Sequence, residues 1–170
     1  RNYPSTSTMS ASGVWTYRLA QRPTGDNNVQ TALGWLRDNY RYDSFINRAN
    51  WPGQYYYMWA AAKAFEVTAD DGSGNFIFAD SIGGVRNPAN DGYPEESARW
   101  YYDFAWWLTE YQDGNGGWSR NGSWNGTAAN AYAILVLARS LGGVCILDDD
   151  NDGLCNTEDN CRHEPNRYRR

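Results

Sequence analysis

The sequence predicts an all-α protein built from helical hairpins. Two segments repeat apolar residues with the period of an amphipathic helix: Val29, Ala32, Leu33 and Leu36 in one, and Trp100, Phe104, Trp107, Leu108 and Tyr111 in the other. Two further segments, 55–67 and 128–138, are apolar on nearly every side, so a helix formed by either should be covered all round by protein. Because one hairpin cannot cover such a helix, we expect further hairpins beside it.

The composition is that of one modest domain rich in amphipathic aromatic residues. The 170 residues include 9 tryptophans, 13 tyrosines and a single lysine, Lys63. Tryptophan and tyrosine suit the lining of a cavity or an interface, because each joins an apolar body to a polar group. The net charge is −5, and residues 145–161 hold six acidic residues and no basic one, so we expect no nucleic-acid partner. No stretch is long and apolar enough to predict a membrane span.

The N-terminal part predicts two helices. Residues 5–19 hold small residues followed by aromatic ones, and we interpret them as a buried helix. After a turn at residues 23–25, any of Asp26, Asn27 and Asn28 can cap the amphipathic helix that follows.

The central part predicts a buried helix and a long connection. Pro52 suits the first turn of the helix over 55–67, because no amide donor is needed there. Residues 68–92 are rich in Gly, Asp, Asn and Pro, and a connection this long usually has a functional or packing role. Within it, residues 76–78 either add a short strand or plug the surface.

The C-terminal hairpin consists of a helix that begins near Trp100, a glycine-rich turn over 112–118 and the apolar helix over 128–138. We expect Glu95 and Glu96 in the first turn of its first helix. The five predicted helices alternate between buried and amphipathic. Two pairs of segments also resemble each other: 32–36 with 104–108, and 57–62 with 132–137. Alternating shells of this kind build an α/α toroid of inner and outer helices.

A short motif strengthens this interpretation. Gln112, Gly116 and Trp118, preceded by Trp106-Trp107-Leu108, resemble the QW motif of the squalene–hopene cyclase and protein prenyltransferase repeat family. The resemblance covers roughly residues 5–143, and it implies that Gln112 and Trp118 tie neighbouring hairpins together. Complete toroids of that family use about twice as many hairpins. We therefore expect residues 1–143 to form an incomplete ring, closed by another protein chain or by the remainder of a longer protein.

The catalytic residues of that family have no counterpart in residues 1–144. That segment contains no Asp-x-Asp-Asp acid, no histidine and no cysteine for a zinc site. We interpret the helical carboxylates Glu66, Asp103 and Glu110 as solvated or ion-paired. We therefore expect a non-catalytic structural or binding protein. The alternatives are a terpenoid-cyclase-like enzyme whose catalytic residues lie outside this chain, and a carbohydrate- or peptide-binding module.

An aromatic cavity would support the binding alternative. The candidates for its lining are Trp15, Tyr56, Trp59, Trp124 and Tyr132. Residues 55–59 point in several directions on a helix, so only about two or three of them can face one cavity. Stacking on a ligand therefore competes with ordinary packing between the two helical shells, which is the more frequent use of such side chains.

The acidic tail predicts a calcium site. Counted from Asp148, oxygen ligands occupy the first, third, fifth, ninth and twelfth positions, with glycine at the sixth and a backbone carbonyl at the seventh, as in an EF-hand loop. Ca²⁺ is a hard cation that prefers such oxygen ligands. The expected ligands are Asp148, Asp150, Asp152, Asn156, Asp159 and the carbonyl of Leu154.

The residues around this loop resemble a thrombospondin type 3 repeat. Asp159-Asn160-Cys161 and Pro165-Asn166 carry the resemblance, which covers about residues 145–166 and implies a calcium-binding module over 144–170. The three cysteines, Cys145, Cys155 and Cys161, cluster here, which favours a disulfide and an extracellular or cell-surface location. The pairings Cys155–Cys161 and Cys145–Cys161 are both possible.

Overall fold

The computed structural model describes residues 5–46, 53–70, 72, 74–96, 98–119 and 126–139, and within these ranges the protein is all-α, as predicted. The described residues form five α-helices: α1 (Ser7–Leu19), α2 (Asn27–Asp38), α3 (Gln54–Glu66), α4 (Trp100–Glu110) and α5 (Gly126–Leu137). The connection between α3 and α4 holds two short 3₁₀ helices, η1 (Ala79–Ser81) and η2 (Pro88–Asp91). Its described residues form no strand, and Phe78 is buried, so this segment plugs the surface.

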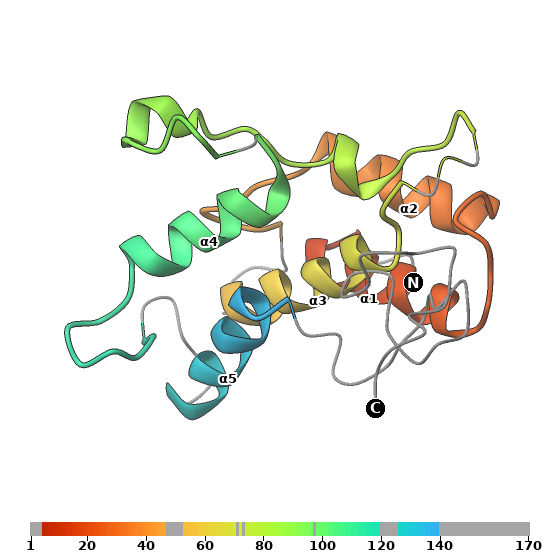
Figure 1. Ribbon diagram of the computed structural model, residues 1–170. Coiled ribbons are helices and arrows are strands. Elements are labelled where there is room, and N and C mark those ends of the chain that lie inside the picture. The colour runs from red at the N-terminus through yellow and green to blue at the C-terminus, as the bar shows by residue number, and fades with distance from the viewer. Residues whose placement is uncertain are drawn as a thin grey trace, which may run out of the picture.

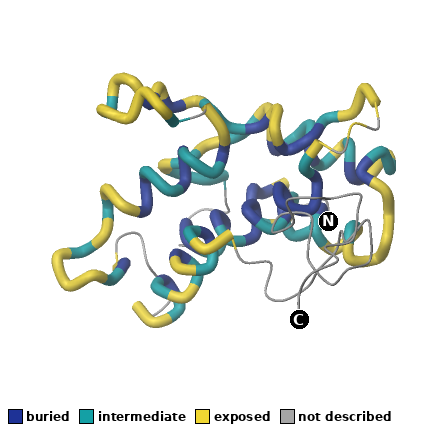
Figure 2. Tube along the Cα trace, viewed as in Figure 1, coloured by how far each residue is buried: buried dark blue, intermediate teal, exposed yellow. Residues whose placement is uncertain are grey.

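Helix α3 is the central element of the fold. It packs against both α1 and α5, while α2 packs on α1 and α4 packs on α5 (Figure 1). Ten of its thirteen residues are buried, and Figure 2 shows the buried residues gathered along it. The prediction of a buried helix over 55–67 is therefore confirmed.

Helices α1 and α5 are buried along one stripe only. The buried positions are Ser7, Ala11 and Val14 on α1, and Ala129, Ala133 and Val136 on α5. By contrast, Met9 is 62% exposed and Ile134 is 56% exposed. The expectation that the helix over 128–138 is covered all round is therefore wrong, and the helix over 5–19, expected to be buried, is buried on one stripe only. Within the described chain, each of them packs on α3 and on one further helix, which leaves one side of each uncovered.

The beginnings of α2 and α4 test two predictions made from the sequence. Asp26 is the N-cap of α2 and accepts a hydrogen bond from the Asn28 amide at 2.8 Å, which selects one of the three predicted caps. Helix α4 begins at Trp100, so the placement of Glu95 and Glu96 in its first turn is wrong. Both glutamates precede the helix, and Glu96 forms an ion pair with Arg86 instead.

Candidate functional site

Four of the five residues predicted to line an aromatic cavity meet across three helices. Trp15 lies on α1, Tyr56 and Trp59 lie on α3, and Tyr132 lies on α5. The centre of the Trp59 ring lies 6.4 Å from that of Trp15, 5.5 Å from that of Tyr56 and 5.2 Å from that of Tyr132. The rings of Tyr56 and Tyr132 are 5.4 Å apart. The fifth candidate, Trp124, lies outside the described residues.

Lys63 completes this group, which we call the aromatic cluster: Trp15, Tyr56, Trp59, Lys63 and Tyr132. Its ammonium nitrogen lies 4.7 Å from the centre of the Trp59 ring and 5.5 Å from that of Trp15, within the range of cation–π attraction. Burial lowers the pKa of Lys63 from its ordinary value. Lys63 stands out in the sequence as the single lysine, but this role was not predicted. The available signal was its spacing, one helical turn beyond Trp59.

The local sequence explains why α3 presents these side chains together. Tyr56, Trp59 and Lys63 stand at i, i+3 and i+7, so they share one face of the helix. These three residues are half-buried, as are Trp15 and Tyr132, whereas the other ten residues of α3 are all buried. The aromatic cluster thus lies partly exposed at the protein surface, although three of its residues belong to the buried helix α3.

Two donors in the aromatic cluster have no acceptor. The indole nitrogens of Trp15 and Trp59 are buried, and neither has a hydrogen-bond partner among the described residues. The contrast is Trp118, whose indole nitrogen donates to the carbonyl of Leu108 at 2.8 Å. Burial raises the pKa of Tyr132, and the nearby Tyr56 adds to this effect, so the Tyr132 phenol stays neutral. A buried unpaired N–H is unfavourable, so the cluster can gain from an acceptor supplied by a ligand.

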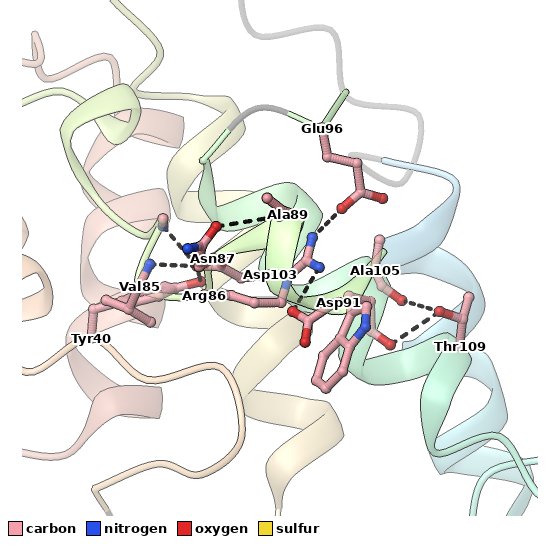
Figure 3. Close-up of polar contacts among 12 residues, drawn as sticks. Tyr40, Val85, Arg86, Asn87, Ala89, Asp91, Glu96, Asp103, Ala105 and Thr109 are labelled. Atoms are coloured by element: carbon pink, nitrogen blue, oxygen red, sulfur yellow. Dashed lines mark hydrogen bonds and ion pairs between the residues drawn. The ribbon is translucent and has the colours of Figure 1, made fainter. Parts of the chain in front are cut away.

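A second polar group surrounds Asp103, which is fully buried on α4 (Figure 3). One carboxylate oxygen accepts hydrogen bonds from the Tyr40 hydroxyl at 3.1 Å, the Gly84 amide at 2.7 Å and the Val85 amide at 3.3 Å. The other oxygen is buried and has no hydrogen-bond partner in the part of the chain that the structure describes. Burial raises the pKa of Asp103, while these hydrogen bonds and nearby Arg86 oppose the rise.

Arg86 fixes the same connection through ionic contacts. It pairs with Asp91 at 3.2 Å and with Glu96, and its guanidinium lies 5.4 Å from the centre of the Trp106 ring (Figure 3). Its side chain is only 2% exposed, so these contacts hold a buried charge. We interpret the Asp103–Arg86 region as a structural anchor of the connection onto α4.

The three helical carboxylates differ in their surroundings. Glu66 is buried and pairs with Arg139 at 2.7 Å, whereas Glu110 is exposed. The expectation of solvated or ion-paired carboxylates is met by these two residues. It is wrong for Asp103, because two backbone amides and a phenol take the place of a cation or water.

The QW-like motif joins the parts of its own hairpin. The Gln112 side chain donates to the Gly116 carbonyl at 2.8 Å, and the backbone amide of Trp118 donates to the side chain of Asn130 at 2.7 Å. With the bond from the Trp118 indole to Leu108, the turn is fastened to both α4 and α5. In the described chain these hydrogen bonds stay inside one hairpin, rather than joining neighbouring hairpins as the resemblance implied.

The predicted calcium ligands and all three cysteines lie beyond residue 139, outside the described residues. The residues that are described hold no group of three or more His, Cys, Asp or Glu side chains placed to bind a metal ion. None of the helices in these ranges has the length and apolar character to cross a bilayer. Searches of family models, of curated proteins and of solved structures gave no match to this chain.

Proposed function

We propose that this chain is a non-catalytic binding module of a secreted or cell-surface protein. The observation that supports this proposal is the aromatic cluster. Its rings come from α1, α3 and α5, yet they stay half-buried and keep two buried indole donors without acceptors. Ordinary core packing would enclose such rings and pair their polar groups. A ligand seated on the cluster would do both.

We further propose that the helices form part of an α/α toroid, with α1, α3 and α5 as the inner row and α2 and α4 outside it. The packing of α3 against both α1 and α5 supports this order. In such a ring the uncovered sides of α1 and α5, which carry Met9 and Ile134, are where another chain or further hairpins would continue. Sedimentation velocity tests this: Ile134→Glu should reduce association, whereas Val85→Glu, on the connection and 61% exposed, should not. A wild-type chain that stays monomeric at micromolar concentration and binds no partner would contradict it.

We also propose that the tail binds one Ca²⁺ through the acidic loop at residues 148–159. The support is the ligand spacing, since the four predicted carboxylate ligands, Asp148, Asp150, Asp152 and Asp159, repel one another in so short a segment unless a cation neutralises them. Calorimetric titration of Ca²⁺ into wild type and Asp152→Ala tests this. Equal heats in the two proteins would contradict the assignment.

The binding proposal is tested by titrating neutral oligosaccharides, acidic oligosaccharides and short peptides while following tryptophan fluorescence. Trp59→Ala should weaken any binding found, because Trp59 contacts every other ring of the cluster. Trp35→Ala, on α2, is the matched control outside the cluster. Product formed from isoprenoid substrates by the isolated chain would instead favour the terpenoid-cyclase alternative.

A further inference from the structure

Helices α1, α3 and α5 bury the same positions. Each has buried residues at the spacing i, i+4, i+7: Ser7, Ala11 and Val14; Gln54, Met58 and Ala61; and Ala129, Ala133 and Val136. This common stripe places the three helices in one register. The same register pairs 57–62 of α3 with 132–137 of α5, the two segments whose sequences resemble each other.

The side of each helix opposite the stripe is the one left open. It holds positions i+2, i+5 and i+9, counted from the first residue of the stripe. On α3 these positions are Tyr56, Trp59 and Lys63, the three residues of that helix that are not buried. Their counterparts, none of which is buried either, are Met9, Ser12 and Thr16 on α1, and Ala131, Ile134 and Ala138 on α5 and just after it. We call these nine residues the shared face.

The shared face is nearly free of charge. Lys63 is its one charged residue, and neither α1 nor α5 contributes another. Met9 and Ile134 are each more than half exposed, so apolar side chains meet water on both sides of the aromatic rings of α3. A continuous apolar surface of this kind marks an interaction site on a soluble protein.

The size of the shared face is that of a small protein interface. Three packed helices of 12 or 13 residues, each about 18 Å long and about 9 Å from the next, span roughly 18 by 27 Å. Specific interfaces begin near about 600 Å² of accessible surface on each partner, and projecting side chains bring a face of this span close to that value. A protein surface can therefore cover the whole face, whereas a small ligand covers only its centre.

We infer that a second copy of this chain docks on the shared face, face to face about a two-fold axis. A two-fold dimer uses one self-complementary patch on both subunits. Two nearly uncharged faces can meet without burying an unpaired carboxylate. This inference rests on the proposed binding function and adds the partner of the same surface. The dimer covers Tyr56 and Trp59, so a ligand of the aromatic cluster competes with dimerisation.

The position of Lys63 selects the direction of the two-fold axis. An axis along α3 would place the Lys63 side chains of the two copies at the same height, where like charges repel. An axis across α3 at Trp59 instead places each Lys63 beside the partner's Tyr56, because Trp59 stands near the middle between these two positions. Ile134 corresponds to Trp59 in the shared register. The same axis therefore places Ile134 opposite the partner's Ile134.

The experiment introduces opposite charges at Ile134 in the full chain. Ile134→Glu and Ile134→Lys should each weaken dimerisation at least about tenfold in sedimentation velocity, because each places like charges across the axis. An equimolar mixture of the two variants should restore dimerisation, since glutamate and lysine then face each other. The matched control is the pair Val85→Glu and Val85→Lys, at a site 61% exposed on the connection, which should dimerise as wild type does.

A second measurement needs no variant and therefore does not depend on whether a variant folds. Hydroxyl-radical labelling of wild type, quantified by mass spectrometry, should fall at Met9 and Trp59 as the concentration rises through the range of dimerisation. Labelling of Trp35, on α2 and outside the shared face, should stay constant.

Three outcomes would each overturn the inference: a wild-type chain that stays monomeric, a mixture that dimerises no better than its components, and labelling of Met9 and Trp59 that does not change with concentration. The proposed function is decided separately by the ligand titration. If oligosaccharides or peptides bind a chain that stays monomeric, the inference fails and the binding module stands. If the chain neither dimerises nor binds any of these ligands, both fail.

Discussion

The hydroxyl of Tyr40 and the carboxylate of Asp103 are 63 positions apart in the chain and 3.1 Å apart in space. Tyr40 follows α2, and its ring stacks on Phe104 with centroids 5.8 Å apart. The same carboxylate oxygen accepts hydrogen bonds from the backbone amides of Gly84 and Val85. One buried side chain therefore fastens three segments: the end of α2, the connection and α4. Burial and the neighbouring carboxylate raise the pKa of Tyr40, so its phenol remains a donor.

Replacing Asp103 by asparagine should flatten the dependence of stability on pH. Folding raises the pKa of Asp103 above its ordinary value of 3.8, so the native state holds the proton more tightly than the unfolded state. The resulting stabilisation is complete below the unfolded pKa and is lost as the pH rises through the folded pKa. The amide of the Asp103→Asn variant has no such proton to lose. Urea unfolding from pH 3 to 8 measures the effect, with the exposed Asp43→Asn as control. Equal slopes for wild type and Asp103→Asn would contradict the prediction.

Gly84→Ala should destabilise the protein more than another alanine substitution at positive φ. Gly84 has φ +68°, and a Cβ there would lie 2.5 Å from the carbonyl oxygen of Ala98. Gly92 has φ +87° with open space around it, so Gly92→Ala meets the conformational penalty alone, about 1–2 kcal/mol. We expect Gly84→Ala to exceed this control by at least about 1 kcal/mol in unfolding free energy, because backbone atoms must move. Similar losses of unfolding free energy for the two variants would contradict the prediction. They would mean that the backbone around Gly84 and Ala98 moves apart without an energetic penalty.

The same substitution should have different effects at two tryptophans. Trp118→Phe removes the hydrogen bond to the Leu108 carbonyl and leaves that buried acceptor unpaired. Trp59→Phe removes an indole N–H that has no partner. The loss of packing volume is of the same kind at both sites, so we expect Trp118→Phe to cost about 1 kcal/mol or more beyond Trp59→Phe. Thermal and urea unfolding of both variants provide the measurement. A larger loss for Trp59→Phe would indicate that its indole has an acceptor after all.

Helical periodicity was sufficient to predict the helices, but it could not predict which apolar helices would be enclosed. The patterns of α3 and α5 are both apolar, yet ten residues of α3 are buried whereas α5 buries three and keeps Ile134 exposed. Enclosure depends on neighbouring helices, which a local pattern does not contain. The burial of Asp103 was missed for the same reason, because its donors come from distant parts of the chain.

The four aromatic members of the aromatic cluster were predicted as cavity candidates, whereas Lys63 and the arrangement of the cluster were not. Tyr56 and Trp59 could be placed together from their spacing on α3. Their contacts with Trp15 and Tyr132 exist because α1 and α5 both pack against α3. A single sequence does not specify which helices pack together. The unpaired indoles could not be predicted from sequence, because every tryptophan carries the same donor.

The ion pair between Glu66 and Arg139 should respond unequally to loss of its two partners. Arg139 donates to both carboxylate oxygens, at 2.7 Å and 3.1 Å, and joins the end of α3 to the end of α5. The side chain of Glu66 is 4% exposed and that of Arg139 is 51% exposed. Arg139→Met therefore leaves a buried charge unpaired, and we expect a loss of about 3 kcal/mol. Glu66→Gln leaves a cation that water can solvate, and we expect a loss of about 1 kcal/mol.

The double variant Glu66→Gln/Arg139→Met decides between this explanation and simple loss of packing. If the unpaired buried charge causes the larger loss, the double variant should be more stable than Arg139→Met alone, because the charge is gone. Urea unfolding of the four proteins at neutral pH completes the cycle. Losses that simply add would mean that water reaches Glu66 once Arg139 is removed, and that the pair contributes little beyond its contacts.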